Sequence, residues 1–299
     1  MALTIIRPGM FTTVQDCGRW GFQARGVPVS GAMDVFSHRL ANALVGNSDN
    51  SATLEATLMG PEIQFDAASR VVITGGEFRV TLDGASVAMN RAFTVPAGST
   101  LKLGDRLKGA RAYVAIAGGI DVPAVLGSRA THVVSGMGGF EGRALRAGDV
   151  LKTGSDPVTR IIRGSDPVVS LPDGGARLRV IAGPAGLGLL ASHRYTVSAR
   201  SDRMGYRLDG PDAGATPSGE VISAPVPTGA VQVPPAGQPI LLMTDHATTG
   251  GYAIAATVIT ADLPLAGQLA PGDWVEFQAC SLEEADAALH DREAALGRA

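Results

Sequence analysis

Polar side chains that could bind a small molecule gather in one interrupted stretch near the N-terminus, residues 12–34. Glycines and a proline break this stretch, so it cannot form a regular helix or a long strand. Polar side chains on such backbone are typical of binding loops, although a solvated surface loop has the same composition. The candidate ligand contacts here are Gln15, Asp16, Arg19, Ser30, Gly31 and Asp34.

Two later segments carry further candidates. Residues 201–207 place Asp202 and Arg203 in a turn, where an Asp–Arg pair that only braces the turn is an equally good explanation. Residues 229–252 combine hydroxyls, amides and a Gly-Gly pair, which suit recognition of a small amide or carboxylate. His246 could act as a general base, but an isolated histidine is more often structural. The candidates in this segment are Gln232, Asp245, Thr248, Thr249, Gly250, Gly251 and Tyr252.

These segments lie in both halves of the chain, and ligand sites favour the interface between domains. We therefore predict one cleft in which Asp16, Arg19, Asp202 and Arg203 are the catalytic residues. An arginine would hold a substrate carboxylate or a developing oxyanion, and an aspartate would orient a proton donor or water.

Composition narrows the classes of protein to consider. The 299 residues allow two domains, and 45% hydrophobic residues with a mean hydropathy of +0.17 indicate a folded globular protein. The 39 glycines and many short apolar runs favour a β-rich fold. A net charge of −3 without a basic block argues against nucleic acid, and no apolar run is long enough to span a membrane. Cys17 and Cys280 lack metal-site spacing, so we expect no metal site and a cytoplasmic protein with reduced thiols.

Local patterns predict several elements. Asp34 should cap a helix over residues 35–45 that ends at Gly46, and Ser281 should begin a terminal helix over 283–296. Residues 52–117 contain only strand patterns, with separate strands predicted over residues 71–74 and 77–82 and a hairpin turn at residues 83–84. Leu-x-x-Gly-Asp recurs from residues 101, 145 and 269 and predicts three tight turns. A linker over residues 154–176 separates a domain of residues 1–165 from one of residues 176–299.

The first segment also resembles a family. Thr-Val-Gln-Asp-x-Gly-Arg at residues 13–19 and Gly-Val-Pro-x-Ser-Gly-Ala-Met-Asp at 26–34 look like the opening of the allophanate hydrolase subunit 2 family. Residues 111–129, 201–210 and 229–252 continue the resemblance. The family includes the C subunit of bacterial 5-oxoprolinase, the carboxyltransferase part of urea carboxylase, and an antagonist of a sporulation-kinase inhibitor. Cys17 stands where the family usually has an apolar residue, which argues against a nucleophilic thiol.

The resemblance implies a mainly β fold with two β-barrel-like subdomains related to cyclophilin and a few short helices. It implies one component of an ATP-dependent amide or lactam hydrolase that opens 5-oxoproline to glutamate. The expected partners are a kinase-inhibitor-like B subunit and a lactam-utilisation-type A subunit, with ATP bound with or by a partner, since no nucleotide motif occurs in this chain. The alternatives are a carboxyltransferase that acts on urea-derived substrates with separate biotin-carrying chains, and a non-enzymatic antagonist of a kinase-inhibitor-like partner.

Overall fold

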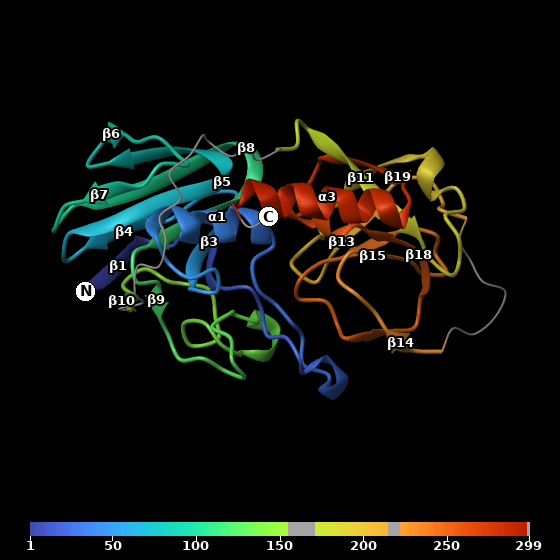
Figure 1. Cartoon of the computed structure of the whole chain (residues 1–299), viewed down its shortest axis with the longest axis horizontal. Helices are drawn as coiled ribbons and strands as arrows, with labels where there is room; N and C mark the ends of the chain where they lie inside the picture. Colours follow the sequence, from blue (N-terminus) through green and yellow to red (C-terminus); the bar gives the residue numbers. More distant parts are fainter. Residues whose placement is uncertain (155–170, 215–221, 298–299) are drawn as a thin grey trace. The chain divides into compact units, whose positions relative to one another are not determined.

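The computed structural model describes residues 1–154, 171–214 and 222–297. The chain forms two compact units (Figure 1). Unit 1 comprises Met1–Arg19 and Ser30–Leu171, and unit 2 comprises Trp20–Val29 and Pro172–Ala299. Both units are mainly β with barrel-like sheets, which confirms the predicted fold class. The relation to cyclophilin stays a prediction.

Unit 1 is built on a ten-stranded sheet in the order β2-β3-β8-β4-β1-β10-β9, with β5 paired to β6, β7 and β8. Its strands are β1 (Ala2–Arg7), β2 (Phe11–Gln15), β3 (Thr53–Thr57), β4 (Glu62–Phe65), β5 (Ser69–Leu82), β6 (Ala85–Ser86), β7 (Phe93–Val95), β8 (Thr100–Ile116), β9 (Ile120–Asp121) and β10 (Val150–Thr153). Two helical segments, α1 (Val35–Val45) and the 3-10 turn η2 (Val133–Ser135), complete it. Alternating side chains of β8 such as Leu101, Leu103, Val114 and Ile116 are buried in its core.

Helix α1 has the predicted bounds. Asp34 caps it, because its carboxylate accepts the main-chain N–H of Ser37 at 2.9 Å, and Gly46 ends it in the left-handed region with φ 87°. Phe36 and Leu40 are buried on the predicted apolar face. The helix packs on β5 and β8. The capping aspartate and the terminal glycine were enough to predict its bounds.

The strand predictions for unit 1 need two corrections. The pieces predicted around Gly75 form one 14-residue strand, β5, because pairing with β8 continues through register shifts near that glycine. The Leu-x-x-Gly-Asp pattern from Leu101 was wrong as a turn, since these residues pair with β4 and β5 inside β8. The hairpin at residues 83–84 is confirmed by the pairing of β5 with β6.

The other two Leu-x-x-Gly-Asp patterns are tight turns, as predicted. Gly148 and Gly272 have φ of 89° and 92°, and each turn leads into a strand. The carboxylate of Asp149 accepts the N–H of Arg146, and that of Asp273 accepts the N–H of Ala270.

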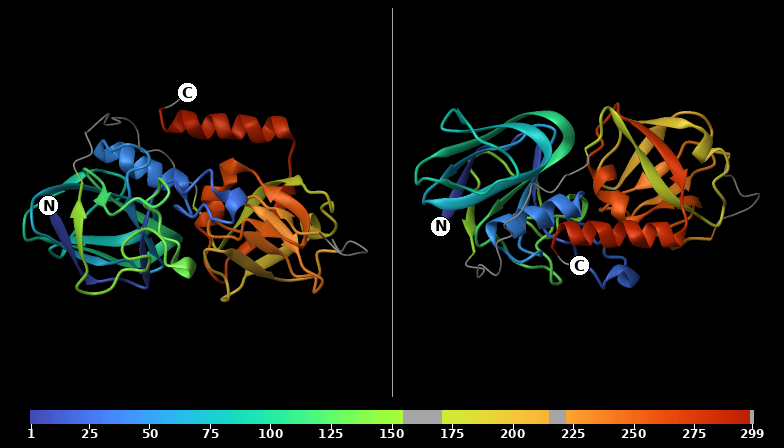
Figure 2. Two further views of the ribbon diagram at one scale, coloured as in Figure 1. Left: turned by 90° about the horizontal axis from the view of Figure 1, so that it is seen from below. Right: turned by 45° about the horizontal axis from the view of Figure 1, so that its top comes forward.

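Unit 2 contains a closed barrel in the order β11-β18-β15-β16-β13-β12-β19 and a separate pair, β14-β17. Figure 2 shows these strands curving around one core. The strands are β11 (Gly175–Ala182), β12 (Arg194–Val197), β13 (Gly205–Asp209), β14 (Ala224–Pro225), β15 (Ala230–Val233), β16 (Ile240–Leu242), β17 (Thr249–Gly250), β18 (Ala253–Val258) and β19 (Trp274–Ala279). Parallel pairing of β11 with β19 closes the barrel around buried residues that include Leu178, Tyr206 and Val275.

The helical segments of unit 2 are short apart from the last. They are η1 (Gln23–Arg25), η3 (Leu190–Ser192), η4 (Thr260–Asp262), α2 (Leu263–Gly267) and α3 (Leu282–Ala295). The predicted capping box is confirmed, because Ser281 Oγ accepts the N–H of Glu284 and the Glu284 carboxylate accepts the N–H of Ser281. No residue of α3 is buried, in line with its charged composition.

Most of the predicted linker lies outside the described residues, and its last two residues, Gly175 and Ala176, are the first two of β11. Among the described residues, no helix is both long and apolar enough to cross a membrane.

Candidate functional site

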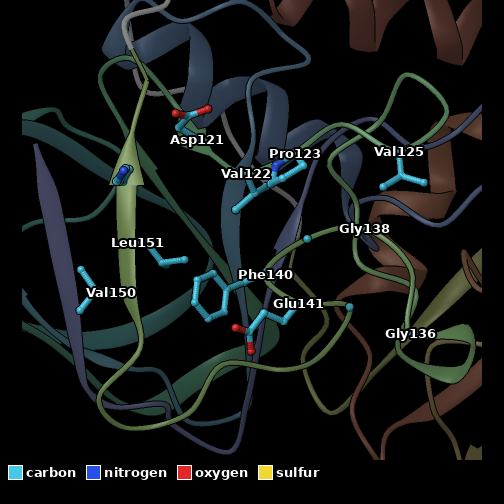
Figure 3. Close-up of a pocket in the computed structure, with 13 residues that line it drawn as sticks. Asp121, Val122, Pro123, Val125, Gly136, Gly138, Phe140, Glu141, Val150 and Leu151 are labelled. Atoms are coloured by element: carbon cyan, nitrogen blue, oxygen red, sulfur yellow. The ribbon is translucent and has the colours of Figure 1, made fainter.

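A cavity of about 500 Å³ opens in unit 1 (Figure 3). Its lining comes from β9, the loop that follows, the turn over residues 136–142, and β10. Three charged residues, Asp121, Glu141 and Lys152, share the lining with apolar side chains that include Phe140 and Leu151. A volume of this size falls within the range of small-molecule pockets.

One wall of the cavity depends on unusual backbone. Gly138, Gly139 and Glu141 adopt the left-handed region, with φ of 69°, 54° and 55°. A Cβ atom at Gly138 would collide with the carbonyl oxygen of Ala130, and one at Gly139 with the side chain of Thr131. The wall therefore lies directly on residues 130–131, and glycine is required for this close approach.

Asp16 holds the loop that carries this wall. Its carboxylate is almost completely buried and accepts three hydrogen bonds. The donors are Ser128 Oγ at 2.7 Å, the N–H of Gly18 at 2.8 Å and the N–H of Arg129 at 2.5 Å. Asp16 thus ties the chain after β2 to residues 128–129, and its oxygens are occupied by this role.

Arg19 and Gln15 bind the same loop. Arg19 is also buried, and its guanidinium donates to the carbonyl oxygens of Val125 at 2.9 Å and Ala130 at 2.8 Å. Gln15 Nε2 donates to the carbonyl oxygen of Thr131 at 3.1 Å. None of Gln15, Asp16 and Arg19 lines the cavity. In this structure they position its wall through the main chain.

The remaining candidates of the first segment lie beside this brace. Ser30 is buried in the left-handed region with φ 57°, and its hydroxyl has no hydrogen-bond partner among the described residues. Gly31 passes so close to Gly18 that a side chain would not fit. Asp34 is fully buried, and its carboxylate is engaged in capping α1. A strained residue with an unpaired buried hydroxyl is unusual and marks Ser30 as the most distinctive of the three.

A buried polar network that the sequence analysis missed supports residues 33–34. Glu55 Oε2 accepts the N–H of Met33 and the hydroxyl of Tyr113, both at 2.8 Å. The Tyr113 oxygen in turn accepts the N–H of Asp34 at 2.7 Å, and Arg111 Nε lies 3.9 Å from the Glu55 carboxylate. Burial, and then the negative charge of Glu55, raise the pKa of Tyr113 well above its usual value. The feature of the sequence that could have revealed this network is Glu55, a charged residue within the buried strand β3.

His38 adds a neutral imidazole to the same region. Its Nε2 lies 3.0 Å from the carbonyl oxygen of Asp49, so Nε2 carries the proton, and its Nδ1 then accepts the hydroxyl of Thr53 at 2.9 Å. Burial lowers the pKa of His38 to about 4. At neutral pH His38 is therefore an uncharged residue of α1, packed against Thr53 of β3 and Asp49.

Unit 2 places Arg203 and Asp245 in a buried ion pair. Arg203 Nε and Nη2 donate to the two Asp245 oxygens at 2.8 and 3.0 Å, and Nη2 also donates to Thr244 Oγ1 at 3.2 Å. Asp202 is exposed, and its carboxylate accepts the N–H groups of Met204 and Gly205 in its own turn. In this structure the charged residues of the segment brace turns.

The other candidates of unit 2 lie around the β14-β17 pair. Gln232 is buried, and its Nε2 has no hydrogen-bond partner among the described residues. Gly250 lies so close to this Nε2 that a side chain would not fit. The carbonyl oxygen of Thr248 accepts the N–H of Val226, whereas the side chains of Thr249 and Tyr252 are exposed and Gly251 is exposed beside them.

His246 uses both ring nitrogens. Nδ1 donates to the carbonyl oxygen of Ala247 at 2.7 Å, so Nε2 accepts the hydroxyl of Thr228 at 3.0 Å. Burial lowers the pKa of His246. The histidine is held in place by two neighbours, as the structural interpretation requires.

The structure thus gathers the candidates into two groups, one in each unit. The first contains Gln15, Asp16, Arg19 and the segment from Ser30, and the second contains the Arg203–Asp245 pair and the Gln232–Gly250 contact. The shared cleft stays a prediction. Within the described ranges, no group of three or more His, Cys, Asp and Glu side chains is arranged to hold a metal ion.

Comparisons with known proteins agree on one family. The family described as "Carboxyltransferase domain, subdomain A and B" matches residues 25–279. The C subunit of the Escherichia coli 5-oxoprolinase is 40% identical over 97% of this chain and 95% of its own length. The C subunit of the Haemophilus influenzae enzyme is 36% identical over 91% of this chain and 89% of its own length.

A solved structure extends the comparison to three dimensions. The Kluyveromyces lactis urea carboxylase superposes with a TM-score of 0.92 at 32% sequence identity. The alignment covers 99% of this chain but 29% of that much longer protein.

Proposed function

This chain belongs to the carboxyltransferase domain family with subdomains A and B, and from that premise we propose that it is the C subunit of a 5-oxoprolinase. The observation that carries the proposal is the nearly full-length match in both directions to the bacterial proteins of that name. Against urea carboxylase, the chain corresponds to less than a third of the protein, so that match supports the domain more than the activity.

The proposed reaction opens the lactam of 5-oxoproline to glutamate, driven by ATP. A lactam carbonyl is stabilised by resonance with its nitrogen, and this makes direct attack by water slow. The complex would include a kinase-inhibitor-like B subunit and a lactam-utilisation-type A subunit. In such a complex, this chain's contribution is a shaped pocket and a braced loop.

The cavity of unit 1 does not fit ATP itself. The cavity of unit 1 offers one lysine, Lys152, against the carboxylates of Asp121 and Glu141, and this set would repel a triphosphate. The glycine-rich turn at residues 136–142 is followed by Arg143-Ala144, without the Lys-Ser/Thr pair of a phosphate loop. We therefore propose that the complex binds ATP with or by a partner protein and not in this cavity.

The test is an activity assay of this chain with the partner chains encoded beside it. With ATP, the complex should form glutamate from 5-oxoproline and should leave urea and allophanate unchanged. The isolated chain should show negligible turnover. Robust ATP-dependent turnover by the isolated chain would contradict the proposed partnership.

A carboxyltransferase acting on urea-derived substrates is the second candidate, because the match in three dimensions to urea carboxylase spans nearly the whole chain. That activity needs a biotin carried by another chain. Avidin, which captures biotin, should abolish turnover in this case and leave a 5-oxoprolinase unaffected.

A further inference from the structure

We propose that the cavity of unit 1 is a docking site in which an extended segment of a partner protein adds a strand to the free edge of β10. The segment is uncharged at this place and directs an apolar side chain into the cavity. The partner is a chain of the proposed complex, so the docking site rests on the proposed function.

Three consecutive residues of β10 line the cavity, namely Val150, Leu151 and Lys152. Successive side chains of a strand point to opposite faces of its sheet. Val150 and Lys152 are exposed on one face, whereas Leu151 is buried in the core on the other. A cavity on either face would meet only alternate residues, so this cavity adjoins the edge of the strand, where the main-chain groups lie.

Two hydrogen bonds show which main-chain groups of β10 face β1. The N–H of Ile5 donates to the carbonyl oxygen of Asp149 at 2.9 Å, and the N–H of Thr153 donates to that of Met1 at 3.0 Å. In an antiparallel pair, every second residue of a strand bonds the same neighbour. Val150 therefore directs its N–H and C=O groups away from β1, toward the other edge of β10.

Strand β9 covers only part of that other edge. It pairs with β10 from Lys152 onward, and its last residue, Asp121, lies opposite Lys152. The same register would place Pro123 opposite Val150, but proline has no N–H to donate. Among the described residues, Val150 is paired only with Thr4 of β1, so its N–H and C=O groups are open toward the cavity. Such an edge is a template for an added strand.

The turn over residues 136–142 forms the opposite wall. Within the described ranges, the main-chain N–H groups of Phe140 and Glu141 donate no hydrogen bond. Figure 3 shows the Phe140 ring between Leu151 and Glu141. An extended peptide carries N–H and C=O groups along both of its edges, so one segment can bind β10 on one side and the turn on the other.

The lining indicates the chemistry of the segment. Lys152 lies directly opposite Asp121, and the Arg143 guanidinium pairs with the Glu141 carboxylate at 2.6 Å. Each charge of the lining thus has an opposite charge beside it, which favours an uncharged segment. Phe140 is half-buried against the core of unit 1 and offers an apolar surface to every second side chain of that segment.

The experiment compares Val150→Pro with Val150→Ala. Proline is tolerated at the first residue of a strand, and β1 does not use this N–H, so Val150→Pro should keep the fold and lose the donor. Val150→Ala keeps the donor and removes most of the side chain. Association with the partner chains encoded beside this one is measured by titration calorimetry. Val150→Pro should weaken it about tenfold or more, and Val150→Ala less than about threefold. Thermal unfolding checks that both variants fold like the parent.

Hydrogen exchange of the parent chain tests the same edge without a substitution. The Val150 amide should exchange rapidly in the isolated chain and at least about tenfold more slowly in the complex. Equal exchange in the two states, or equal association of Val150→Pro and the parent, would overturn the docking site. Protection that grows with the concentration of the isolated chain would also overturn it, because a second copy would then be the occupant.

The docking site and the proposed function fail separately. A complex that turns over 5-oxoproline, but binds Val150→Pro as tightly as the parent, would overturn the docking site and leave the function in place. Association that depends on the Val150 N–H, in a complex without 5-oxoproline turnover, would keep the docking site and overturn the proposed function.

Discussion

The two units brace their candidate loops with different partners. In unit 1, Asp16 and Arg19 bind mostly main-chain groups of residues 125–130. In unit 2, Arg203 binds the side chain of Asp245. A side chain can be replaced together with its partner, but a main-chain group cannot. In unit 1, substitution is therefore restricted at Asp16 and Arg19 individually. In unit 2, it is restricted for Arg203 and Asp245 jointly.

The largest effect should come from breaking the pair in unit 2. Arg203→Met leaves the Asp245 carboxylate buried without its cation, so the free energy of unfolding should fall by about 4 kcal/mol. Adding Asp245→Leu removes that charge as well and should restore most of the loss. Urea denaturation of the parent, both single variants and the double variant measures the coupling. If the double variant is no more stable than Arg203→Met, the unpaired Asp245 charge is not the cause of the loss, and the difference drawn between the two units is wrong.

Removal of the brace in unit 1 should have the next largest effect. Asp16→Ala leaves the Ser128 hydroxyl and the N–H of Arg129 without their acceptor, and the free energy of unfolding should fall by about 3 kcal/mol. Asp202→Ala is the matched control, because that carboxylate is exposed in its turn and should cost less than about 1 kcal/mol. If both substitutions cost the same, the loop of unit 1 is not held by Asp16.

The pH dependence of unfolding tests the buried network of unit 1. The pKa of His38 is about 4 in the folded chain and 6.5 in a model peptide, so the unfolded chain binds the proton more readily. Stability is therefore present above pH 6.5 and is lost as the pH falls, by about 2 kcal/mol between pH 7 and 5. Nearby charges act in both directions, since Asp16 and Glu55 raise this pKa and Arg39 lowers it, but burial is the largest cause.

The control for this prediction is His38→Gln, which lacks the imidazole ring that must lose its proton when the chain folds at low pH. The variant should be less stable at pH 7 but should lose less stability between pH 7 and 5. His246 of unit 2 also has a pKa lowered by burial, so part of the slope should remain in the variant. If the stability of His38→Gln depends on pH as steeply as that of the parent, the pKa of His38 is nearly the same in the folded and unfolded chain, and His38 does not cause the pH dependence.

Sequence patterns predicted the elements whose signals are local. Helix α1 was defined by a capping aspartate and a terminal glycine, and the hairpin at residues 83–84 by two adjacent residues. The sequence predicted separate strands over residues 71–74 and 77–82, whereas pairing with β8 continues through Gly75 and makes one strand, β5. Long-range pairing decided this case, and no local pattern records it.

The same limit applies to the candidate site. Residue types marked Asp16 and Arg19 as important, but their partners lie 112 and 106 positions away along the chain. The sequence therefore could not distinguish a side chain that faces a ligand from one that positions a loop. Glu55 and Tyr113 were missed for the same reason, since their contacts to residues 33–34 exist only in the folded chain.

The smallest effect should come from the one thiol in the first segment. Cys17 Sγ donates to the carbonyl oxygen of Asp49 at 3.3 Å, and the side chain is half-buried next to the residues that brace the loop. A weak thiol donor of this kind adds little to the position of the loop, so Cys17→Ala should change the 5-oxoproline turnover of the reconstituted complex by less than about threefold. Removal of a covalent nucleophile would instead cost about a thousandfold or more. A loss on that scale, with unchanged thermal unfolding, would assign chemistry rather than positioning to the segment of unit 1 and would reverse the comparison between the units.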